Sequence, residues 1–325
     1  MKNRSVQLDA LRGVAALAVL FAHADAYDLV KSPFLTEHKI FLGHFGVALF
    51  FILSGGMIWR SIQRADLGTY ALNRITRIAP LYFACIAFVV LAMPLIGSYY
   101  IFNVTSETIW RHVTFTQSFG DNVSRSLNPV LWTLSWEMAF YIVVPLLLLF
   151  SRWINPAWFL IPAVMATPWA QFVGLFAIGI ALEEIRAGRS SLPRGAALAL
   201  AIVAFLAISR PEWVLPCGVA IAAGVLYAVP LPKWTGITLA PLAFVGLVSY
   251  SLYIWHYLLL EIAGWKLDDI RAVMGPVFRD DLWRALIVLA TILVISTASY
   301  LVIERPFMGP VRRWLTAPKH KLATA

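Results

Sequence analysis

The sequence contains few charged residues and few cysteines. Only 13% of its 325 residues are Asp, Glu, Lys or Arg, whereas a soluble domain carries about 25%. Together with a hydrophobic fraction of 60%, this excludes an ordinary soluble protein and indicates a polytopic membrane protein. The two cysteines, Cys85 and Cys217, both fall in apolar segments, which argues against a disulfide framework.

The sequence also lacks the short motifs of several enzyme classes. It contains no DxD, HExxH, GxSxG or P-loop pattern, so it does not indicate metal-dependent, serine-dependent or nucleotide hydrolysis. We therefore expect no metal and no permanently bound cofactor. The net charge of +9 comes from short basic patches between apolar segments, a pattern typical of membrane topology. We expect a lipid bilayer as partner, and no nucleic acid.

Apolar segments occur along the whole chain, and a membrane-spanning helix needs about 20 such residues. On that template the sequence predicts spans near 6–25, 41–59, 80–100, 130–150, 154–168, 169–185, 194–209, 213–230, 241–262 and 283–303. The stretch 153–185 can form one long tilted helix or two short ones. We predict an all-α integral membrane protein of about ten transmembrane helices, with one domain over 1–310 and a basic cytoplasmic tail over 311–325.

The distribution of basic residues predicts the orientation. With ten spans and an inner N-terminus, sixteen Lys and Arg fall on the inner side and nine on the outer side. This bias fits ten spans better than nine and places both termini in the cytoplasm. The N-terminal segment could also be read as a cleavable signal peptide, but Asp9 and Arg12 interrupt its apolar region. We expect it to remain as a membrane helix.

The first apolar segment, LDALRGVAALAVLFAH (8–23), contains two ionisable side chains that need an explanation. An arginine at the bilayer centre costs about 3 kcal/mol. Arg12 and His23 are eleven residues apart, so they lie on one face of a helix, about 16 Å from each other along its axis. We expect Arg12 in the inner part of the membrane and His23 near its outer boundary.

Further ionisable residues are expected at two levels of the membrane. Glu137, His256 and His44 are expected in the outer half with His23, a set suited to acid–base chemistry on a hydroxyl. An inner level is rich in arginine and suits a phosphorylated ligand. The arginines of this inner level are Arg60, Arg74, Arg77 and Arg305.

Several motifs resemble the membrane-bound acyltransferase-3 family. The first is segment 8–23, in which an Arg is followed by a His eleven positions later. The other motifs, in order, are GVALFFILSGGMI (46–58), RITR (74–77), LWTLSWEMAFYIVVP (131–145), SYSLYIWHYLLL (249–260) and IERP (303–306). The resemblance covers nearly the whole chain and departs at Ala48 and Gly56, where family members often have an acidic and an aromatic residue. No SGNH-type domain is expected after the tenth span.

The resemblance implies an acyl-CoA-dependent O-acyltransferase of the bacterial cytoplasmic (inner) membrane. Its donor would be a cytoplasmic acyl-CoA, usually acetyl-CoA, and its acceptor a hydroxyl of a surface or secreted carbohydrate or its lipid-linked precursor. His23 would act as a general base or be acylated transiently. The implied catalytic residues are His23, Arg12, Glu137 and His256, and those implied in CoA binding are Arg74, Arg77, Arg60 and Ser54.

Structural interpretations and a second function class compete with this hypothesis. Arg12 can extend to the headgroups, Glu137 can pair with an arginine, and the basic motif 74–77 can bind anionic lipid. A proton-coupled transporter or polysaccharide export component could use His23, Glu137 and His256 as a proton relay. Such transporters often contain repeated halves, and the sequence shows no internal repeat.

The sequence does not specify the acceptor or the oligomeric state. Two loops expected outside the membrane, 101–129 and 264–282, combine aromatic and acidic residues and fit a sugar without naming one.

Overall fold

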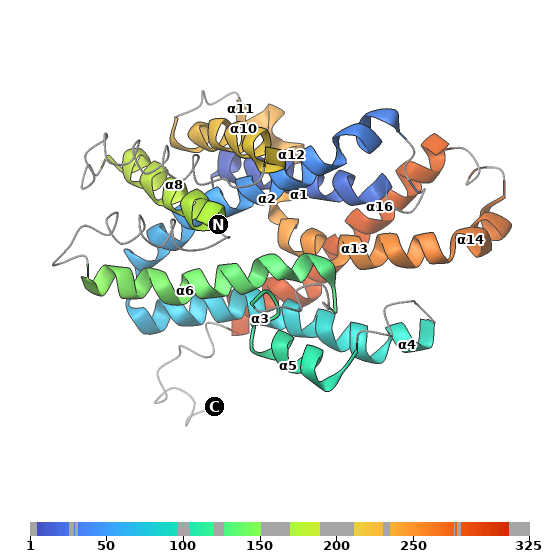
Figure 1. Ribbon diagram of the computed structural model, residues 1–325, viewed down its shortest axis with the longest axis horizontal. Coiled ribbons are helices and arrows are strands. Elements are labelled where there is room, and N and C mark those ends of the chain that lie inside the picture. The colour runs from blue at the N-terminus through green and yellow to red at the C-terminus, as the bar shows by residue number, and fades with distance from the viewer. Residues whose placement is uncertain are drawn as a thin grey trace.

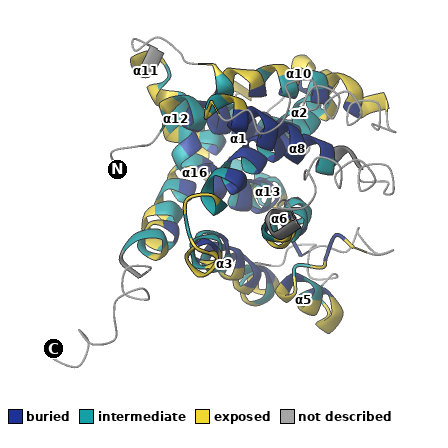
Figure 2. Cartoon of the chain, turned by 90° about the vertical axis from the view of Figure 1, so that its left-hand side faces the viewer, coloured by how far each residue is buried: buried dark blue, intermediate teal, exposed yellow. Residues whose placement is uncertain are grey.

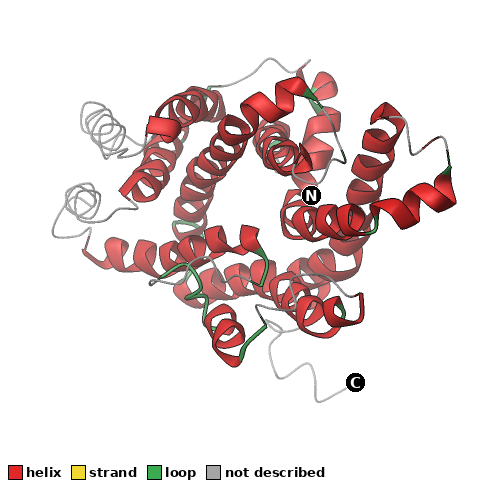
Figure 3. Cartoon of the chain, turned by 45° about the vertical axis from the view of Figure 1, so that its right-hand side comes forward, coloured by secondary structure: helices red, strands yellow, loops and turns green. Residues whose placement is uncertain are grey.

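Helices make up all the regular structure in the part of the chain that the structure describes, which confirms the all-α prediction (Figure 3). The computed structural model describes residues 5–25, 29, 32–96, 104–119, 127–150, 170–188, 211–229, 235–275, 277 and 281–311. The predicted spans 154–168 and 194–209 and the tail from residue 312 lie outside these residues.

The helices follow one another along the chain as Figure 1 labels them. They are α1 (Val6–Ala24), α2 (Pro33–Ile62), α3 (Leu67–Leu91), α4 (Met93–Ile96), α5 (Ser106–Val113), η3 (Pro129–Leu131), α6 (Trp132–Phe150), α8 (Ala170–Arg186), α10 (Pro211–Ala228), α11 (Thr235–Thr238), α12 (Ala240–Leu247), α13 (Ser249–Trp265), α14 (Leu267–Met274), α16 (Asp281–Ser299), η4 (Tyr300–Glu304) and η5 (Phe307–Val311). Six of the described helical segments are long and apolar enough to cross a membrane, or up to seven with the bent pair α12–α13.

Two of the spanning helices extend well beyond the segments predicted from hydrophobicity. Helix α2 begins at Pro33, eight residues before the predicted span, because proline at the first helical position starts a helix well. Its 30 residues correspond to about 45 Å, more than the thickness of the hydrocarbon core. Helix α3 begins at Leu67, where Asp66 accepts a hydrogen bond from the N–H of Thr69 at 2.9 Å. The basic segment 60–79 is therefore largely helical and continuous with the third span.

The predicted continuous span over 241–262 is wrong in shape. The structure has two helices there, α12 and α13, which meet at Val248 at an angle of 72°. The bend lets α12 cross α1 at close range, since a Cβ atom on Gly246 would meet the backbone carbonyl of Asp9. Beyond the bend, α13 still contacts α1 and also packs against α16 and α3. No proline lies at the bend, so hydrophobicity alone gave no sign of it.

Four of the long helices run in the same direction. Along α2 and α8, Phe51 contacts Phe172 and, further along both helices, Trp59 contacts Glu184. Along α6, Trp136 faces Phe172 and Phe140 stacks on Phe176, so α6 is also parallel to α8.

Helix α10 completes the parallel set, with Trp213 beside His44 near the start of α2 and Tyr227 close to Gly56 near its end. The end of α6 and the start of α8 therefore lie at opposite ends of this set, as do the end of α8 and the start of α10.

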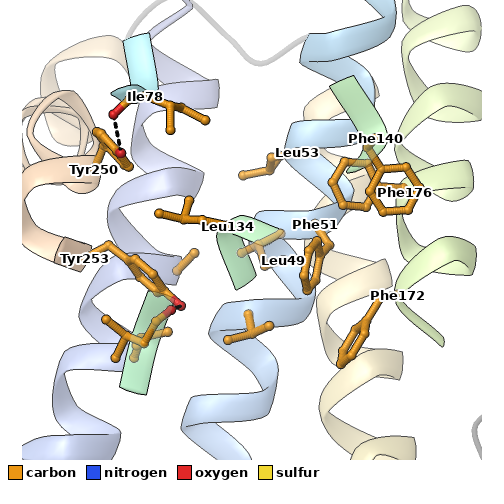
Figure 4. Packing of buried hydrophobic residues seen from close by; sticks show 14 of the residues in the cluster. Leu49, Phe51, Leu53, Ile78, Leu134, Phe140, Phe172, Phe176, Tyr250 and Tyr253 are labelled. Atoms are coloured by element: carbon orange, nitrogen blue, oxygen red, sulfur yellow. Dashed lines mark hydrogen bonds between the residues drawn. The ribbon is translucent and has the colours of Figure 1, made fainter. Parts of the chain in front are cut away.

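The core of the molecule lies where α1 and α2 pack against each other and against α8, α10 and α12. Figure 2 shows α1, α2 and α8 with mostly buried surface, whereas α10 and α16 expose much of theirs. In the close-up, the rings of Phe140 and Phe176 stack with centroids 3.6 Å apart, and the Tyr250 hydroxyl donates a hydrogen bond to the Ile78 carbonyl (Figure 4). This tight apolar packing holds the helices that carry the ionisable residues.

Candidate functional site

Three cavities follow one another through the helix bundle. The arginine cavity is lined by Arg12, Met57, Arg60, Ser61, Arg64, Ala65, Thr69, Asn73, Arg74 and Arg77. The central cavity is lined by Arg12, Val47, Phe50, Phe51, Ser54, Met57, Ile58, Arg74, Arg77, Ile78, Thr133, Leu134, Glu137, Ser249, Tyr250 and Tyr253. The histidine cavity is lined by Val19, Ala22, His23, Lys39, Ile40, Gly43, His44, Val47, Pro129, Val130, Trp132, Trp213 and Tyr253.

Shared residues connect the three cavities into one path. The arginine and central cavities share Arg12, Met57, Arg74 and Arg77. The central and histidine cavities share Val47 and Tyr253. Helix α1 runs the length of this path, with Arg12 at one end and His23 three turns away at the other.

His23 and His256 form a pair in which the proton positions follow from geometry. The Nδ1 of His23 lies 2.8 Å from the carbonyl oxygen of Val19, and the Nδ1 of His256 lies 2.8 Å from that of Tyr253. A carbonyl oxygen only accepts, so each Nδ1 carries the hydrogen and donates it. His256 Nε2 lies 3.3 Å from His23 Nδ1 and accepts a second, weaker share of the same hydrogen. The basic lone pair of His23 is therefore on Nε2.

The surroundings of the pair fix its orientation. His256 is buried on α13, and its backbone contacts hold the ring in place, while His23 is half-buried at the end of α1. The ring of Tyr257 meets His23 edge-on at a centroid distance of 5.2 Å. The structure thus brings together two of the predicted catalytic residues that are far apart in sequence.

The predicted CoA-binding arginines gather at the other end of the path. Five arginines and no carboxylate line the arginine cavity, so its charge is strongly positive. The guanidinium of Arg74 donates to the Ser61 hydroxyl at 3.1 Å and lies over the rings of Tyr70 and Tyr141 at 5.8 and 5.5 Å. Arg60 lies 4.0 Å from Glu183. Arg305 does not line any of the three cavities.

Glu137 lies in the central cavity rather than beside the two histidines. Its carboxylate accepts a hydrogen bond from Tyr141 at 2.6 Å, and it shares the cavity with Arg74 and Arg77. Helix α6 starts near the histidine cavity, which Val130 lines, and runs away from it. Seven residues of helix place Glu137 about 10 Å further along. Glu137 was expected at one outer level with the histidines. In the structure, Glu137 lines the central cavity, and His23 and His44 line the neighbouring histidine cavity.

Two further predicted residues also line the path. His44 lies in the histidine cavity, where its ring stacks on Trp213 at 3.7 Å and its Nδ1 donates to the carbonyl of Glu212 at 3.2 Å. Ser54 lines the central cavity on α2. His44 therefore contributes to the wall of the histidine cavity and Ser54 to the wall of the central cavity. Val47, which lines both cavities, lies between them in sequence on α2.

Buried glutamates on two helical segments, η4 and α8, were missed by the sequence reasoning. Glu304 is 1% exposed, accepts a hydrogen bond from Ser251 and lies within electrostatic range of Arg77 and Arg12. It belongs to the motif 303–306. Because a carboxylic acid in an apolar span is energetically costly, its position in the sequence could have marked Glu304 as a candidate site residue. Glu183 binds Arg186 at 2.6 Å, and the neighbouring Glu184 accepts from Trp59 at 2.6 Å.

These glutamates also connect parts of the bundle. Glu304 lies close enough to Arg77 and Arg12, which both line the arginine cavity, for their charges to interact. Glu183 and Glu184 tie α8 to the C-terminal end of α2 through Arg60 and Trp59. Among the described residues, no group of three or more His, Cys, Asp or Glu is placed to hold a metal ion.

Comparison with known proteins agrees with the motifs. The family model described as an acyltransferase domain, acyltransferase-3, matches residues 5–301. A protein named as a membrane-bound transacylase, BcsY, of Komagataeibacter xylinus is 26% identical over 94% of this chain and 83% of its own length. The peptidoglycan O-acetyltransferase OatA of Listeria monocytogenes is 23% identical over 92% of this chain, which corresponds to only 55% of OatA.

Shorter similarities extend the comparison. Nodulation protein 10 of Rhizobium leguminosarum is 31% identical over 45% of this chain and 45% of its own. The comparison with solved structures finds no match. Because the family model covers most of the sequence, the chain belongs to the acyltransferase-3 family.

Proposed function

We propose that this protein transfers an acyl group from cytoplasmic acyl-CoA to a carbohydrate hydroxyl on the other side of the membrane. The observation that carries the proposal is the path of three cavities, with arginines at one end and the His23–His256 pair at the other. Arg12 and His23 are about 16 Å apart along α1. The phosphopantetheine arm of CoA is long enough to bridge that distance.

The donor end of the path is suited to phosphate groups. Arginine binds phosphate through charge-assisted and bidentate hydrogen bonds, and five arginines line this cavity. Arg60, Arg74 and Arg77 hold the CoA phosphates, and Arg12 and Ser54 line the route of the arm. Glu137 faces the arm from α6 and keeps Tyr141 in place through their hydrogen bond.

The reaction takes place at the histidine end. As a general base, His23 Nε2 removes the proton from the acceptor hydroxyl, whose oxygen forms a bond to the thioester carbonyl carbon while the carbon–sulfur bond breaks. The thiolate of CoA leaves and takes up the proton. As a transient acyl carrier, Nε2 attacks the thioester carbonyl carbon and the CoA thiolate leaves; the acceptor hydroxyl then attacks the acyl-imidazolium, its proton passes to the thiolate, and neutral His23 is restored. His256 holds His23 in the tautomer that both routes need.

The relatives support an acetyl group and a carbohydrate acceptor. OatA is named a peptidoglycan O-acetyltransferase, and a protein of Acidianus two-tailed virus with 26% identity is named an acetyltransferase. We infer a surface or secreted carbohydrate, or its lipid-linked precursor, as acceptor. From the family resemblance we also infer that the protein lies in a bacterial cytoplasmic membrane.

Ten spans with both termini in the cytoplasm are part of the proposal. The parallel directions of α6, α8 and α10 support it, since the chain has to cross between them twice. With the arginine cavity facing the cytoplasm, the positive-inside bias of the sequence and the direction of α1 agree.

The test compares the O-acyl content of surface carbohydrate in cells that produce wild-type protein, His23→Ala or His38→Ala at equal membrane abundance. His38 is half-buried on α2 and lines none of the three cavities, so it is the matched control. We expect the ester with wild type and His38→Ala and its loss with His23→Ala. Equal ester in all three would remove His23 from the chemistry.

A second measurement separates the enzyme from a transporter. Micromolar CoA should raise the melting temperature of purified wild-type protein in detergent, because a ligand that binds only the folded state stabilises it. A protein that adds no ester and does not respond to CoA would instead favour the proton-coupled transporter.

A further inference from the structure

The junction between the central and histidine cavities has two walls. Val47 on α2 and Tyr253 on α13 are the residues that line both cavities, and both are 8% exposed. If the proposed function holds, the acyl group has to pass between these two side chains to reach His23. His256 lies three residues beyond Tyr253, so this junction is about 4.5 Å before the histidine pair along α13.

The tyrosine wall is held in place by several contacts. The Tyr253 hydroxyl donates to the carbonyl oxygen of Val130 at 2.8 Å and lies 2.8 Å from the Thr133 hydroxyl, which donates to it. Its ring also meets Phe50 edge-on at 5.8 Å. The ring cannot swing aside without breaking both hydrogen bonds, each of which contributes about 1 kcal/mol. Figure 4 shows Tyr253 near Leu134, and both residues line the central cavity.

The valine wall is equally fixed. The preceding residue, Gly46, packs against α1 so closely that an added Cβ would lie 2.6 Å from the Ala15 carbonyl oxygen and 2.7 Å from a Val19 methyl group. Helix α2 therefore cannot shift closer to α1 at this height to widen the junction. Val47 itself has a β-branched side chain, which in a helix is restricted to one main rotamer.

We propose that Val47 and Tyr253 form a filter that selects the transferred acyl group by its cross-section. An unbranched acyl group has the same width as the unbranched cysteamine end of the pantetheine arm that follows it, and it passes between the two walls. An acyl group branched at the carbon next to the carbonyl is wider and is excluded. The filter makes straight-chain acyl thioesters the donor class, which deepens and rests on the proposed function.

The experiment compares n-butyryl-CoA with isobutyryl-CoA, which have the same atoms and differ only in branching. Transfer to the native acceptor is measured in membranes, with acetyl-CoA as the reference donor for each variant. We expect wild type to prefer n-butyryl over isobutyryl by about tenfold, the discrimination expected for one misplaced methyl group.

Substitutions that widen the junction and a substitution that narrows it should change this preference in opposite directions. Val47→Ala widens the junction and Tyr253→Phe releases the ring, so both should bring the ratio toward one. Val47→Leu narrows the junction and should raise the ratio. Val89→Ala on α3 removes the same atoms from a buried valine that lines none of the three cavities, and it should leave the ratio unchanged.

The outcomes separate the filter from the proposed function. If no variant and no wild-type sample transfers any acyl group, the acyltransferase proposal itself fails. If acetyl is transferred but the ratio is near one in wild type, or is the same in wild type, Val47→Ala, Val47→Leu and Tyr253→Phe, the filter is refuted. If one variant loses acetyl transfer because it misfolds, the remaining variants still test the proposed filter.

Discussion

At the scale of single residues, the contact with His23 explains why the imidazole of His256 lies buried on α13. A lone buried imidazole in an apolar helix would leave polar nitrogens in need of partners. Here the backbone of α13 accepts one hydrogen and His23 faces the other nitrogen. In the proposed reaction, His256 is a positioning residue, which acts on the acyl group through His23.

Replacing His256 should affect turnover more than donor binding. We expect His256→Ala to lower kcat by about 100-fold, the lower range of what a positioned base contributes. The KM for acyl-CoA should stay close to that of wild type, because the donor site lies at the far end of the path. Steady-state kinetics in detergent measure both.

Tyr257→Phe is the matched control, since its ring would still rest against His23. This variant should keep wild-type kcat. An increase in KM with unchanged kcat in His256→Ala would show that His256 serves the donor site, and would contradict a positioning role.

His112 on α5, outside the spanning segments, should make stability depend on pH. Its Nδ1 donates to the Thr108 carbonyl at 2.7 Å and its Nε2 accepts the N–H of Leu127 at 3.3 Å, so the native ring is neutral. Burial lowers its pKa below the ordinary 6.5. Below pH 6.5 the unfolded chain binds a proton that the native state does not, so stability falls with pH until the lowered native pKa is reached.

The measurement is the melting temperature in detergent from pH 8 to pH 5. We expect it to fall more steeply below pH 6.5 in wild type than in His112→Gln, which has no group to titrate at this position. The comparison concerns the slope and not the absolute melting temperature, because the variant also loses native contacts. Identical slopes would mean that His112 takes up its proton equally in both states.

At the scale of elements, the helices are placed by close backbone contacts between α2 and α8. A Cβ atom on Gly55 would meet the backbone carbonyl of Phe176, and one on Gly179 would meet that of Ile52. Without water to drive helices together, membrane helices associate through such close packing at small residues. This contact fixes the height at which Ser54 faces the central cavity.

Gly55→Ala should therefore destabilise the protein although alanine favours a helix. Overpacking costs about 1–3 kcal/mol, more than the gain of about 1 kcal/mol in helix propensity. Gly43→Ala on the same helix is the control, since its Cβ would lie 3.4 Å from the Ala22 methyl, an ordinary contact. Thermal unfolding should show a lower melting temperature for Gly55→Ala alone. Equal melting temperatures would show that α8 can shift to accept the methyl group.

The helices themselves were largely predictable from sequence, and their bends and ends were not. Hydrophobicity identifies α1, α3, α6, α10 and α16 because lipid requires long apolar helices. The bend at Val248 depends on the contact of α12 with α1, which no local pattern contains. The extra turns of α2 depend on a helix start at Pro33 that lies outside the apolar segment.

The candidate site was predictable to a similar extent. Arg12 and His23 share one helix, so their spacing follows from helix geometry alone. The approach of His256 to His23 joins residues 233 positions apart and needs the packing of two helices. The location of Glu137 depends on where η3 begins, and Glu304 has a clear role only once Arg77 and Arg12 are seen next to it.

At the scale of the whole molecule, the directions of the helices predict which loops face which side. The C-terminal end of α2 leads into α3 through residues 63–66, and α8 ends at the same side. Helix α14 lies at the opposite end of the molecule, beyond α13, and α5 lies beside the second half of α3. Since Cys85 and Cys217 are both buried, single cysteines placed at exposed positions report sidedness with little background.

A membrane-impermeant maleimide should label Ser106→Cys and Ala272→Cys in intact cells, because both positions are exposed on the helices expected outside. Gly68→Cys and Ala187→Cys, also exposed, should react only after the membrane is permeabilised. Labelling of Gly68→Cys from outside would reverse the orientation and place the arginine cavity away from CoA. Labelling of Ala187→Cys from outside, with Gly68→Cys protected, would mean that α8 does not run parallel to α2 across the membrane. If all four positions are labelled as expected, the result is consistent with ten spans. Ten spans require the chain to cross the membrane an odd number of times between α6 and α8, and again between α8 and α10.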